Sequence, residues 1–385
     1  MTTSTEQQQE TTTTPDNTLQ PHHNHLKPCR NRAHSYRHPN AHTPLGGITC
    51  HDENIIKAQR SVIFQLVKQV GKNVLMGRDL LYVTFPIQCC EAESALQRFA
   101  HSASYAKFLA RAAQVVDDPV ERMRWVIAFY IAGMHCTCVF MKPLNPILGE
   151  TFQAQLDSET WVYVEQSSHH PPVTQVLVTG PGYRYYTWVT YSAHFRYNQI
   201  QLVHSGYRVV YFDDGTQIEW NNPWDVFHGV FWGTYRQETL GKIRFQDVKN
   251  GVYADITLGN VKHYPSDHFQ GTMYRSRKKQ HEEEEKGMVG QIKGSWLEYL
   301  QIDGDVYWSY ALDHEKKAIP RCLDAKYLLP SDSTFREDVL YLEKGDLETA
   351  QEKKIGLEEQ QRMERKWRIR KTRGGFSFLH PFQKK

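Results

Sequence analysis

The chain has 385 residues, of which 40% are hydrophobic and 12% aromatic, so it can bury a large core in one big domain or two ordinary ones. Lys and Arg number 46 against 43 Asp and Glu, and the formal net charge of +3 favours neither a histone-like nucleic-acid binder nor an acidic, solvated chain. Seven cysteines without the spacing of a small disulfide scaffold, and no apolar signal region, favour a reducing, cytosolic compartment. Because the net charge is small, any basic site for a partner must be a local cluster of Lys and Arg.

The N-terminal segment predicts disorder. Residues 1–50 hold six of the 19 histidines and ten threonines but almost no large apolar side chains, so they cannot offset the entropy lost on ordering. Weak metal binding by the histidines is the alternative, but the paired spacing of a metal site is missing. We expect a folded domain over residues 51–373 and a second flexible tail over 374–385.

Helical patterns dominate the first third of the expected domain. Apolar residues over 55–70 recur at helical spacing between Lys, Arg and Gln, and a second helical pattern covers 91–116. The apolar run over 125–141 stops at 17 residues, short of the roughly 20 that a membrane span needs. Because Asp118 and Pro119 supply an N-cap and a first-turn proline, this run predicts a core helix. Helices are therefore expected over about 91–141.

After the helices, the pattern changes to short β-branched or aromatic stretches such as "WVYVE", "VTQVLVT" and "VYADITL", broken by Gly, Pro or Asp. Regular short strands without helices between them predict an antiparallel barrel or sandwich over about residues 152–312. The mixed-charge segment 275–286 is expected to be a solvated loop between strands. Helix is predicted again over about 336–373.

Standard enzyme signatures are missing: the chain has no nucleophile elbow, no phosphate-binding loop, no zinc-protease motif and no dinucleotide motif. In "HCTC", Cys136 and Cys138 lie two residues apart on a predicted helix and do not share a face. We expect them to be buried free thiols rather than metal ligands.

The most informative stretch is "EQSSHHPP", residues 165–172, at the end of a predicted strand. His169 and His170 are poor joint metal ligands if the chain is extended, because neighbouring side chains then point apart, and Pro171 favours an extended His170. Ser168 beside His169 could suggest a nucleophile and base, but sequence neighbours rarely have that geometry. An isolated pair of histidines could equally be structural, so the surrounding pattern decides.

Two other segments supply donors and cations. In "KPLNPILGETF", two prolines hold Lys142 and Asn145 as pre-organised donors. In the predicted helix "EKKIGLEEQQRMER", charged residues four apart share one face: Lys354, Glu358 and Arg362. Alone, that helix would be typical of a solvated salt-bridge ladder, with the glutamate able to orient both cations.

Together these segments resemble the oxysterol-binding protein family, lipid-transfer proteins whose signature reads Glu-Gln-x-Ser-His-His-Pro-Pro. Residues 165–172 match it, with Ser167 where an apolar residue is usual. "KPLNPILGETF" is similar to the family's second signature, and "QCCEAESALQRFAHSASYAKFLARA" to the helix before it. The resemblance covers about residues 51–373, without the targeting domains of longer relatives. "SDST", residues 331–334, departs from the family's Thr-Asp-Ser-Arg.

The resemblance implies a mixed α and β fold: an incomplete antiparallel β-barrel around a lipid tunnel, with an N-terminal helical lid over 55–70 and a helical C-terminal region. It implies a sterol or another lipid in the tunnel, exchanged for phosphatidylinositol 4-phosphate, whose headgroup lies at the mouth. The implied headgroup site comprises Lys142, Asn145, His169, His170, Lys354, Glu358 and Arg362. The implied lid and lipid-chain contacts are Ile56, Ile63, Val67, Leu80 and Val83. No catalytic residue, metal or cofactor is implied.

The leading hypothesis is thus a non-enzymatic exchanger of lipids between cytosolic membrane surfaces. The alternative is a lipid-regulated sensor or scaffold without net transport, and a lipid hydrolase comes third because a nucleophile motif is missing. Residues 362–373 hold seven Lys or Arg and one Glu, and "GGFSFLHPF" follows, which suits an anionic bilayer rather than nucleic acid. We expect a monomeric cytoplasmic protein that associates peripherally with organelle membranes.

Overall fold

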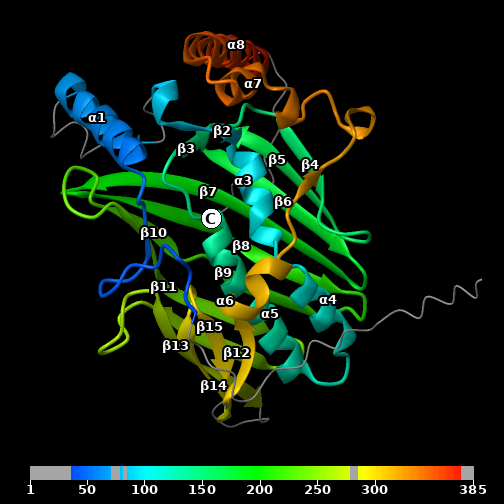
Figure 1. Cartoon of the computed structure of the whole chain (residues 1–385). Helices are drawn as coiled ribbons and strands as arrows, with labels where there is room; N and C mark the ends of the chain where they lie inside the picture. Colours follow the sequence, from blue (N-terminus) through cyan, green and yellow to red (C-terminus); the bar gives the residue numbers. More distant parts are fainter. Residues whose placement is uncertain (1–35, 71–78, 81–84, 278–284, 374–385) are drawn as a thin grey trace, which may run out of the picture.

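The dominant feature of the fold is one large antiparallel sheet. The computed structural model describes residues 36–70, 79–80, 85–277 and 285–373 (Figure 1). In this part of the chain fifteen strands form the sheet. Thirteen strands follow one another in its path, in the order β16-β15-β14-β13-β12-β11-β10-β8-β7-β6-β5-β4-β17, while β1 and β9 pair beside that path.

The strands of this sheet are short to medium in length, except for two long ones that pair along their whole length. These two are β7 (Tyr183–Arg196) and β8 (Gln199–Phe212). The other strands are β1 (Ile48–Thr49), β4 (Thr151–Gln155), β5 (Trp161–His169), β6 (Pro172–Gly180), β9 (Gln217–Asn221), β10 (Trp224–His228), β11 (Arg236–Asp247), β12 (Val252–Leu258), β13 (His268–Arg277), β14 (Glu285–Ser295), β15 (Tyr299–Ile302), β16 (Asp305–Ser309) and β17 (Arg321–Cys322).

The sheet curls without closing, because its path starts at β16 and ends at β17, and these two strands are not paired in the described residues (Figure 1). Along β5, β6 and β7 buried and more exposed residues alternate, as expected for a sheet with one face toward a core. The predicted incomplete antiparallel barrel is confirmed.

Helix α5 (Pro119–Gly133) fills part of the space inside the curved sheet, against β11, β12, β15 and β16. It starts as predicted: the Asp118 carboxylate accepts hydrogen bonds from the amides of Val120 and Glu121, both at 3.0 Å. Most of its residues are buried, because it contacts protein on nearly every side. The helix ends at Gly133, earlier than the predicted 141, and a 3-10 turn, η4 (Met134–Thr137), follows. Cys136 and Cys138 are free thiols but only half-buried.

The helix predicted over 91–116 is instead three elements with a strand first. These are β2 (Cys90–Ser94), α3 (Ala95–Ala100) and α4 (Lys107–Gln114), with the short 3-10 turn η3 (His101–Ala103) before α4. The cause is Ser94, whose side chain accepts from the Leu96 amide while its own amide donates to the Gln97 side chain, so a helix begins only after it. The residues before Ser94 pair in parallel with β3 (Lys142–Leu144).

Residues 36–50 are ordered, which corrects the prediction of a disordered tail over 1–50. β1 pairs with β11, Ile48 is only 3% exposed, and Arg37 forms an ion pair with Asp267 at 2.7 Å. These are contacts with residues about 190 to 230 positions away, and composition does not reveal them. Residues 1–35 and 374–385 lie outside the described residues. Strands β13 and β14 also extend into the loop predicted over 275–286, of which 278–284 lies outside the described part.

Two helical regions lie at the same end of the barrel (Figure 1). One is α1 (Glu53–Val70), which the sequence predicts as the lid, and the other comprises α7 (Glu337–Glu343) and α8 (Leu347–Arg373). Between them lie β2 and β3, so this end of the barrel is built from segments of both ends of the domain. In the described residues, no helix has the length and hydropathy needed to cross a membrane.

We predict that Ile48→Ala lowers the free energy of unfolding by about 2–5 kcal/mol, because it leaves a cavity where β1 packs against the core. Urea unfolding measures the change, and Leu45→Ala, in the same segment but 52% exposed, is the matched control with an effect near zero. Equal stability of both variants and the parent would show that residues 36–50 do not dock onto the barrel.

Candidate anion-binding site

A cavity of about 420 Å³ lies between α8, β3 and the hairpin that joins β5 to β6. Its wall is mixed, with apolar side chains of Phe85, Leu144 and Ile147 beside a concentration of cationic and hydrogen-bonding groups. The polar and charged lining residues are Lys142, Asn145, Ser167, Ser168, His169, His170, Arg336, Lys354, Glu358, Gln361, Arg362, Arg365 and Arg368. The fold therefore gathers positive charge at one end of the barrel.

All seven residues that the sequence suggests for a headgroup site line this cavity. They come from three separate segments: β3 with the loop after it, the hairpin after β5, and α8. The three segments lie apart in the sequence, at residues 142–145, 169–170 and 354–362, so only the tertiary fold brings their side chains together.

On α8, Glu358 binds both predicted cations of its helix. Its Oε1 accepts from Lys354 Nζ at 2.6 Å, and its Oε2 accepts from Arg362 Nη2 at 3.2 Å. Lys354 is buried, at 8% exposure, whereas the Arg362 side chain is 60% exposed. The helix thus places one cation at the floor of the cavity and another at its mouth, and the glutamate fixes both.

Lys142 is half-buried beside a second cation. Its Nζ donates to the Asn145 side-chain oxygen and to the Pro143 carbonyl, and it lies 5.8 Å from the centre of the Phe85 ring. Burial lowers the pKa of Lys142, and the positive charge of Lys354 acts in the same direction. Because the two ammonium groups repel each other in a partly desolvated site, this site suits a polyvalent anion.

The two histidine rings are in contact, with centroids 4.6 Å apart and planes at 72°. The expectation that they point apart is wrong, because His169 ends β5 opposite Pro172 while His170 and Pro171 form the hairpin turn, with a cis peptide between them. They can therefore act on one ligand together. No group of three or more His, Cys, Asp or Glu placed to hold a metal ion is found in the described ranges.

Burial keeps both histidines neutral near pH 7. Burial lowers the pKa of His169 to about 4, and the neighbouring charge of His170 adds to this. Burial also lowers the pKa of His170, followed by the effect of Arg365. Each neutral ring carries one N–H, and His169 would exchange its hydrogen bond to the Pro146 backbone for one to an anion.

Ser168 holds the turn rather than serving His169. Its hydroxyl donates to the Pro171 carbonyl at 2.7 Å, and its own carbonyl accepts from the Gln166 side chain, also at 2.7 Å. The Ser168 hydroxyl therefore shapes the hairpin instead of donating to His169, as a nucleophile would donate to its base.

Several lining residues were not singled out by the sequence analysis. Arg365 and Arg368 belong to the basic run assigned to membrane contact, and they follow Arg362 at spacings of three residues, a signal that could have placed them on the cavity side. Arg336 was missed because nothing nearby in the sequence marks it. It is buried and bound by Glu150 at 2.9 Å and Asp338 at 2.6 Å, so it supports the wall instead of offering free charge.

The predicted lid contacts form an apolar cluster beside the barrel end. Ile63 and Leu80 are buried there, and Ile56 and Val67 pack against the same cluster. Their neighbours on the barrel include Ala193 and Phe195 of β7 and Ile200 and Leu202 of β8. Val83 lies outside the described residues. On its other side α1 reaches the cavity wall, because Val62 and Leu66 pack with Leu144 and Val339.

The family model described as oxysterol-binding protein matches residues 65–377, which is most of the chain. The chain belongs to the oxysterol-binding protein family. It is 32% identical over 343 residues to oxysterol-binding protein 9 of Dictyostelium discoideum, covering 83% of this chain and 79% of that protein. It is 26% identical over 313 residues to human oxysterol-binding protein-related protein 6, covering 76% of this chain but only 33% of that longer protein.

Solved structures of family members share the fold. The Osh3 ORD of Saccharomyces cerevisiae in complex with PI(4)P aligns with a TM-score of 0.64 at 22% identity, covering 88% of each chain. The Osh1 ORD domain in complex with ergosterol aligns with a TM-score of 0.66 at 21% identity, covering 88% of this chain and 85% of that one. The same domain with cholesterol gives a TM-score of 0.68.

We predict that Lys142→Met raises the free energy of unfolding of the ligand-free protein by about 1 kcal/mol at pH 7, since it removes a poorly solvated cation. The pKa of Lys142 is lower in the folded than in the unfolded chain, so between these two values the unfolded chain binds more protons and stability rises with pH. The free energy of unfolding of the parent should therefore rise relative to that of the variant as the pH approaches 10.

Urea unfolding at pH 7 and pH 9.5 measures both effects. Lys326→Met is the control, since that side chain is 67% exposed and its removal should change neither value. A Lys142→Met protein that unfolds at clearly lower urea concentration than the parent would contradict the view that this cation is held at a cost.

Proposed function

We propose that this protein binds phosphatidylinositol 4-phosphate with the headgroup in the cavity described above and exchanges it for a sterol or another membrane lipid between cytosolic membrane surfaces. The observation that carries the proposal is the convergence of seven donor and charged residues, from three segments, on one cavity of about 420 Å³.

The charge of the ligand suits the cavity. A phosphate monoester carries close to two negative charges at neutral pH and three strong acceptor oxygens. Lys142, Lys354 and Arg362 can donate charge-assisted hydrogen bonds, and His169 and His170 can each add a neutral donor. Such a site holds its ligand without breaking a bond, so we propose no catalytic step and no cofactor.

The relatives support both ligand classes. Osh3 was solved with PI(4)P and Osh1 with ergosterol and with cholesterol, in domains that share this fold. We infer that the apolar part of either ligand lies inside the barrel beneath α1, in contact with Ile56, Ile63, Val67 and Leu80. Exchange follows if one interior holds only one lipid at a time.

Helix α8 supports membrane contact. In the part of this helix with described side chains, Met363, Trp367 and Ile369 are 45–61% exposed, beside Arg365 and Arg368 at the cavity. Apolar side chains that insert at the interface, next to cations that attract anionic lipids, suit a peripheral protein that docks with the cavity facing the bilayer. We propose a cytoplasmic location with reversible membrane association.

Transfer between two liposome populations tests the proposed function. Donor liposomes carry dehydroergosterol and acceptor liposomes carry phosphatidylinositol 4-phosphate, and the protein should speed sterol transfer to the acceptor while phosphoinositide moves the opposite way. Sterol transfer should slow several-fold when the acceptor lacks phosphoinositide. Binding of both lipids without net movement of either would favour the sensor or scaffold, and release of inorganic phosphate would indicate a hydrolase.

We predict that the double variant His169→Ala, His170→Ala loses at least tenfold in phosphatidylinositol 4-phosphate extraction, because each hydrogen bond to a charged group contributes about 1.5–3 kcal/mol. Sterol extraction and the melting temperature should stay at parent values. Equal loss of both lipids together with a lower melting temperature would make the histidines structural, and unimpaired phosphoinositide extraction would place the headgroup elsewhere.

The same pair should give a pH dependence. An anion raises the pKa of His169 above its value of about 4, so binding takes up protons and weakens as the pH rises through the range between the two pKa values. The difference in affinity between parent and double variant should therefore shrink from pH 6 to pH 8, whereas a constant difference would exclude proton uptake by these rings.

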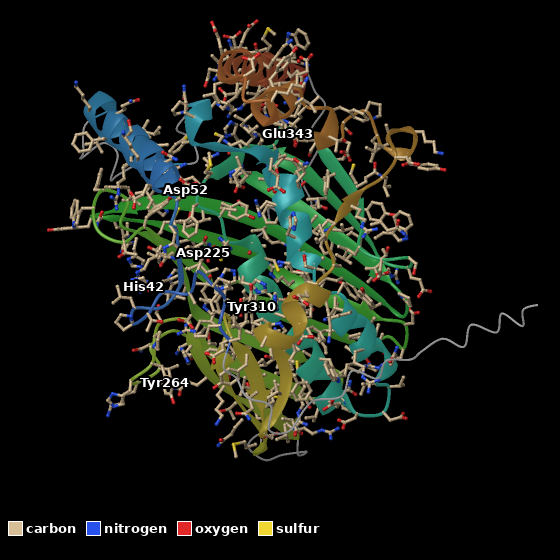
Figure 2. All side chains as sticks on the ribbon, viewed as in Figure 1. His42, Asp52, Asp225, Tyr264, Tyr310 and Glu343 are labelled. Atoms are coloured by element: carbon tan, nitrogen blue, oxygen red, sulfur yellow. The ribbon has the colours of Figure 1, made fainter. Side chains whose placement is uncertain are left out.

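We also predict that Trp367→Ala weakens binding to anionic liposomes about tenfold, because a tryptophan at the interface contributes roughly 1.5–3 kcal/mol. Tyr264→Ala is the matched control: that ring is 62% exposed but lies at the far end of the molecule from α8 (Figure 2). Sedimentation with liposomes measures both, and an equal effect of the two variants would remove α8 as the docking surface.

A further inference from the structure

The interior of the barrel changes from apolar to polar along β8. Strand pairing puts Ile200, Leu202, His204 and Arg208 on one face of β8, and Leu202 and Ile200 pack in the apolar cluster beneath α1. Arg208 is eight residues beyond Ile200 on β8, which at 3.3 Å per residue is about 26 Å along the strand. There its guanidinium lies 5.2 Å from the ring of Tyr130 of α5, so Arg208 points into the barrel.

Arg208 is bonded only to neutral groups within the described residues. Its Nε donates to Asn222 Oδ1 at 2.6 Å, its Nη1 donates to Tyr185 Oη at 2.5 Å, and Tyr130 is a further hydrogen-bond partner, while no carboxylate of the described residues lies within ion-pair distance. Burial raises the pKa of both Tyr130 and Tyr185, so these phenols stay neutral and do not balance the charge. A cation held among neutral groups in a barrel interior is costly.

Arg208 also borders space that the protein does not fill. Although it faces inward and contacts α5, its side chain is only half-buried, and Tyr130 and Leu202 on the same inner surface are half-buried as well. Inward residues of a fully packed core would be buried, as Val210 and Tyr185 are. The inner wall from Leu202 to Arg208 therefore faces accessible interior volume.

Other donors near Arg208 lack acceptors. Trp220 of β9 is paired directly with Arg208, and its Nε1 is buried with no acceptor in the described part of the chain. The Nδ2 of Asn222 is in the same condition. This gives two unpaired donor groups beside the Arg208 guanidinium, both of which an acceptor from outside could satisfy.

The carboxylate found on the inner surface is placed elsewhere and is occupied. Asp225 of β10 (Figure 2) lies opposite Leu202, six residues along β8 from Arg208, and although both charges act on His204, no ion pair joins them. It accepts a hydrogen bond from Thr239 at 2.6 Å and lies 3.3 Å from His204 Nε2. Asp225 therefore does not neutralise the guanidinium directly.

We propose that Arg208, with Asn222 and Trp220, binds the acidic head group of a lipid held inside the barrel, with the apolar part of that lipid toward α1. The ligand class is an amphiphile that ends in a carboxylate, sulfate or phosphate monoester. A charged acceptor would compensate the cation and use the unpaired donors, whereas a neutral hydroxyl would leave the charge unbalanced. This rests on the proposed function, because it specifies which cargo the lipid-holding interior takes.

The test compares an acid with its neutral ester. Binding of pyrene-labelled palmitic acid and of its methyl ester is measured by fluorescence at pH 7.5 with the parent, Arg208→Gln and Arg208→Lys. The parent should bind the acid at least tenfold more tightly than the ester. Arg208→Gln should remove this preference by weakening the acid alone, and Arg208→Lys should keep part of it.

Arg244→Gln is the matched control, because this arginine lies on β11 with a side chain 53% exposed and should leave the preference unchanged. Equal binding of acid and ester by the parent would overturn the proposal. Equal weakening of both probes in Arg208→Gln would overturn it too, since that result means a structural role for the arginine.

Two further measurements separate the outcomes. Native mass spectrometry of the parent with equimolar oleic acid, oleoyl lysophosphatidic acid and cholesterol should show the acidic lipids bound, and their ratio tells carboxylate from phosphate; cholesterol alone would overturn the proposal. Phosphatidylinositol 4-phosphate extraction, run in parallel, should be as strong in Arg208→Gln as in the parent. If neither the parent nor the variants extract phosphatidylinositol 4-phosphate, the result counts against the proposed function. The fluorescence comparison of acid and ester then still decides whether Arg208 binds an acidic head group.

Discussion

The site depends on one buried ionic cluster, formed by Glu150, Arg336 and Asp338, all at most 8% exposed. Arg336 binds both carboxylates and also donates to the Asn145 carbonyl at 2.9 Å. Glu150 accepts in addition from Ser94 and from Ser333. The cluster thereby joins the strand–helix segment at β2, the loop that carries Asn145 and the C-terminal region that leads to α8. Removing one partner would leave a buried charge unpaired, which is far more costly than losing a surface ion pair.

The buried cluster and the neighbouring cavity differ in how their charges are balanced, and this difference gives them different roles. In the cluster every charge has an opposite charge at hydrogen-bond distance. In the cavity Glu358, the one carboxylate among the described lining residues, binds both Lys354 and Arg362, and Lys142 donates only to neutral acceptors. Satisfied ionic groups give rigidity, and unsatisfied ones give affinity for an added anion. The same distinction applies inside the barrel, where Arg208 has only neutral partners in the described residues. The two unbalanced regions lie at different depths of one lipid-binding fold.

Local patterns predicted the fold class, and the three segments that they single out meet at one cavity. "EQSSHHPP" and the four-residue spacing of Lys354, Glu358 and Arg362 are local signals. Residues 167–170 of the first line the cavity, as do all three charged residues of the second. Features that depend on distant contacts could not be predicted. The Arg336–Glu150 pair spans 186 residues, and the pairing of Ile48 with Gln237 orders a segment whose composition is typical of disorder. The contact between the histidine rings arises from a turn at His170 that the rule for residues before proline does not describe.

The most direct measurement of the central claim is an experimental structure of the protein bound to phosphatidylinositol 4-phosphate. We expect the 4-phosphate within hydrogen-bond distance, about 3 Å, of Lys142, Lys354 and at least one of the two histidines, with the acyl chains in the barrel beneath α1. A headgroup bound outside the cavity of about 420 Å³, or acyl chains that remain outside the barrel, would contradict it.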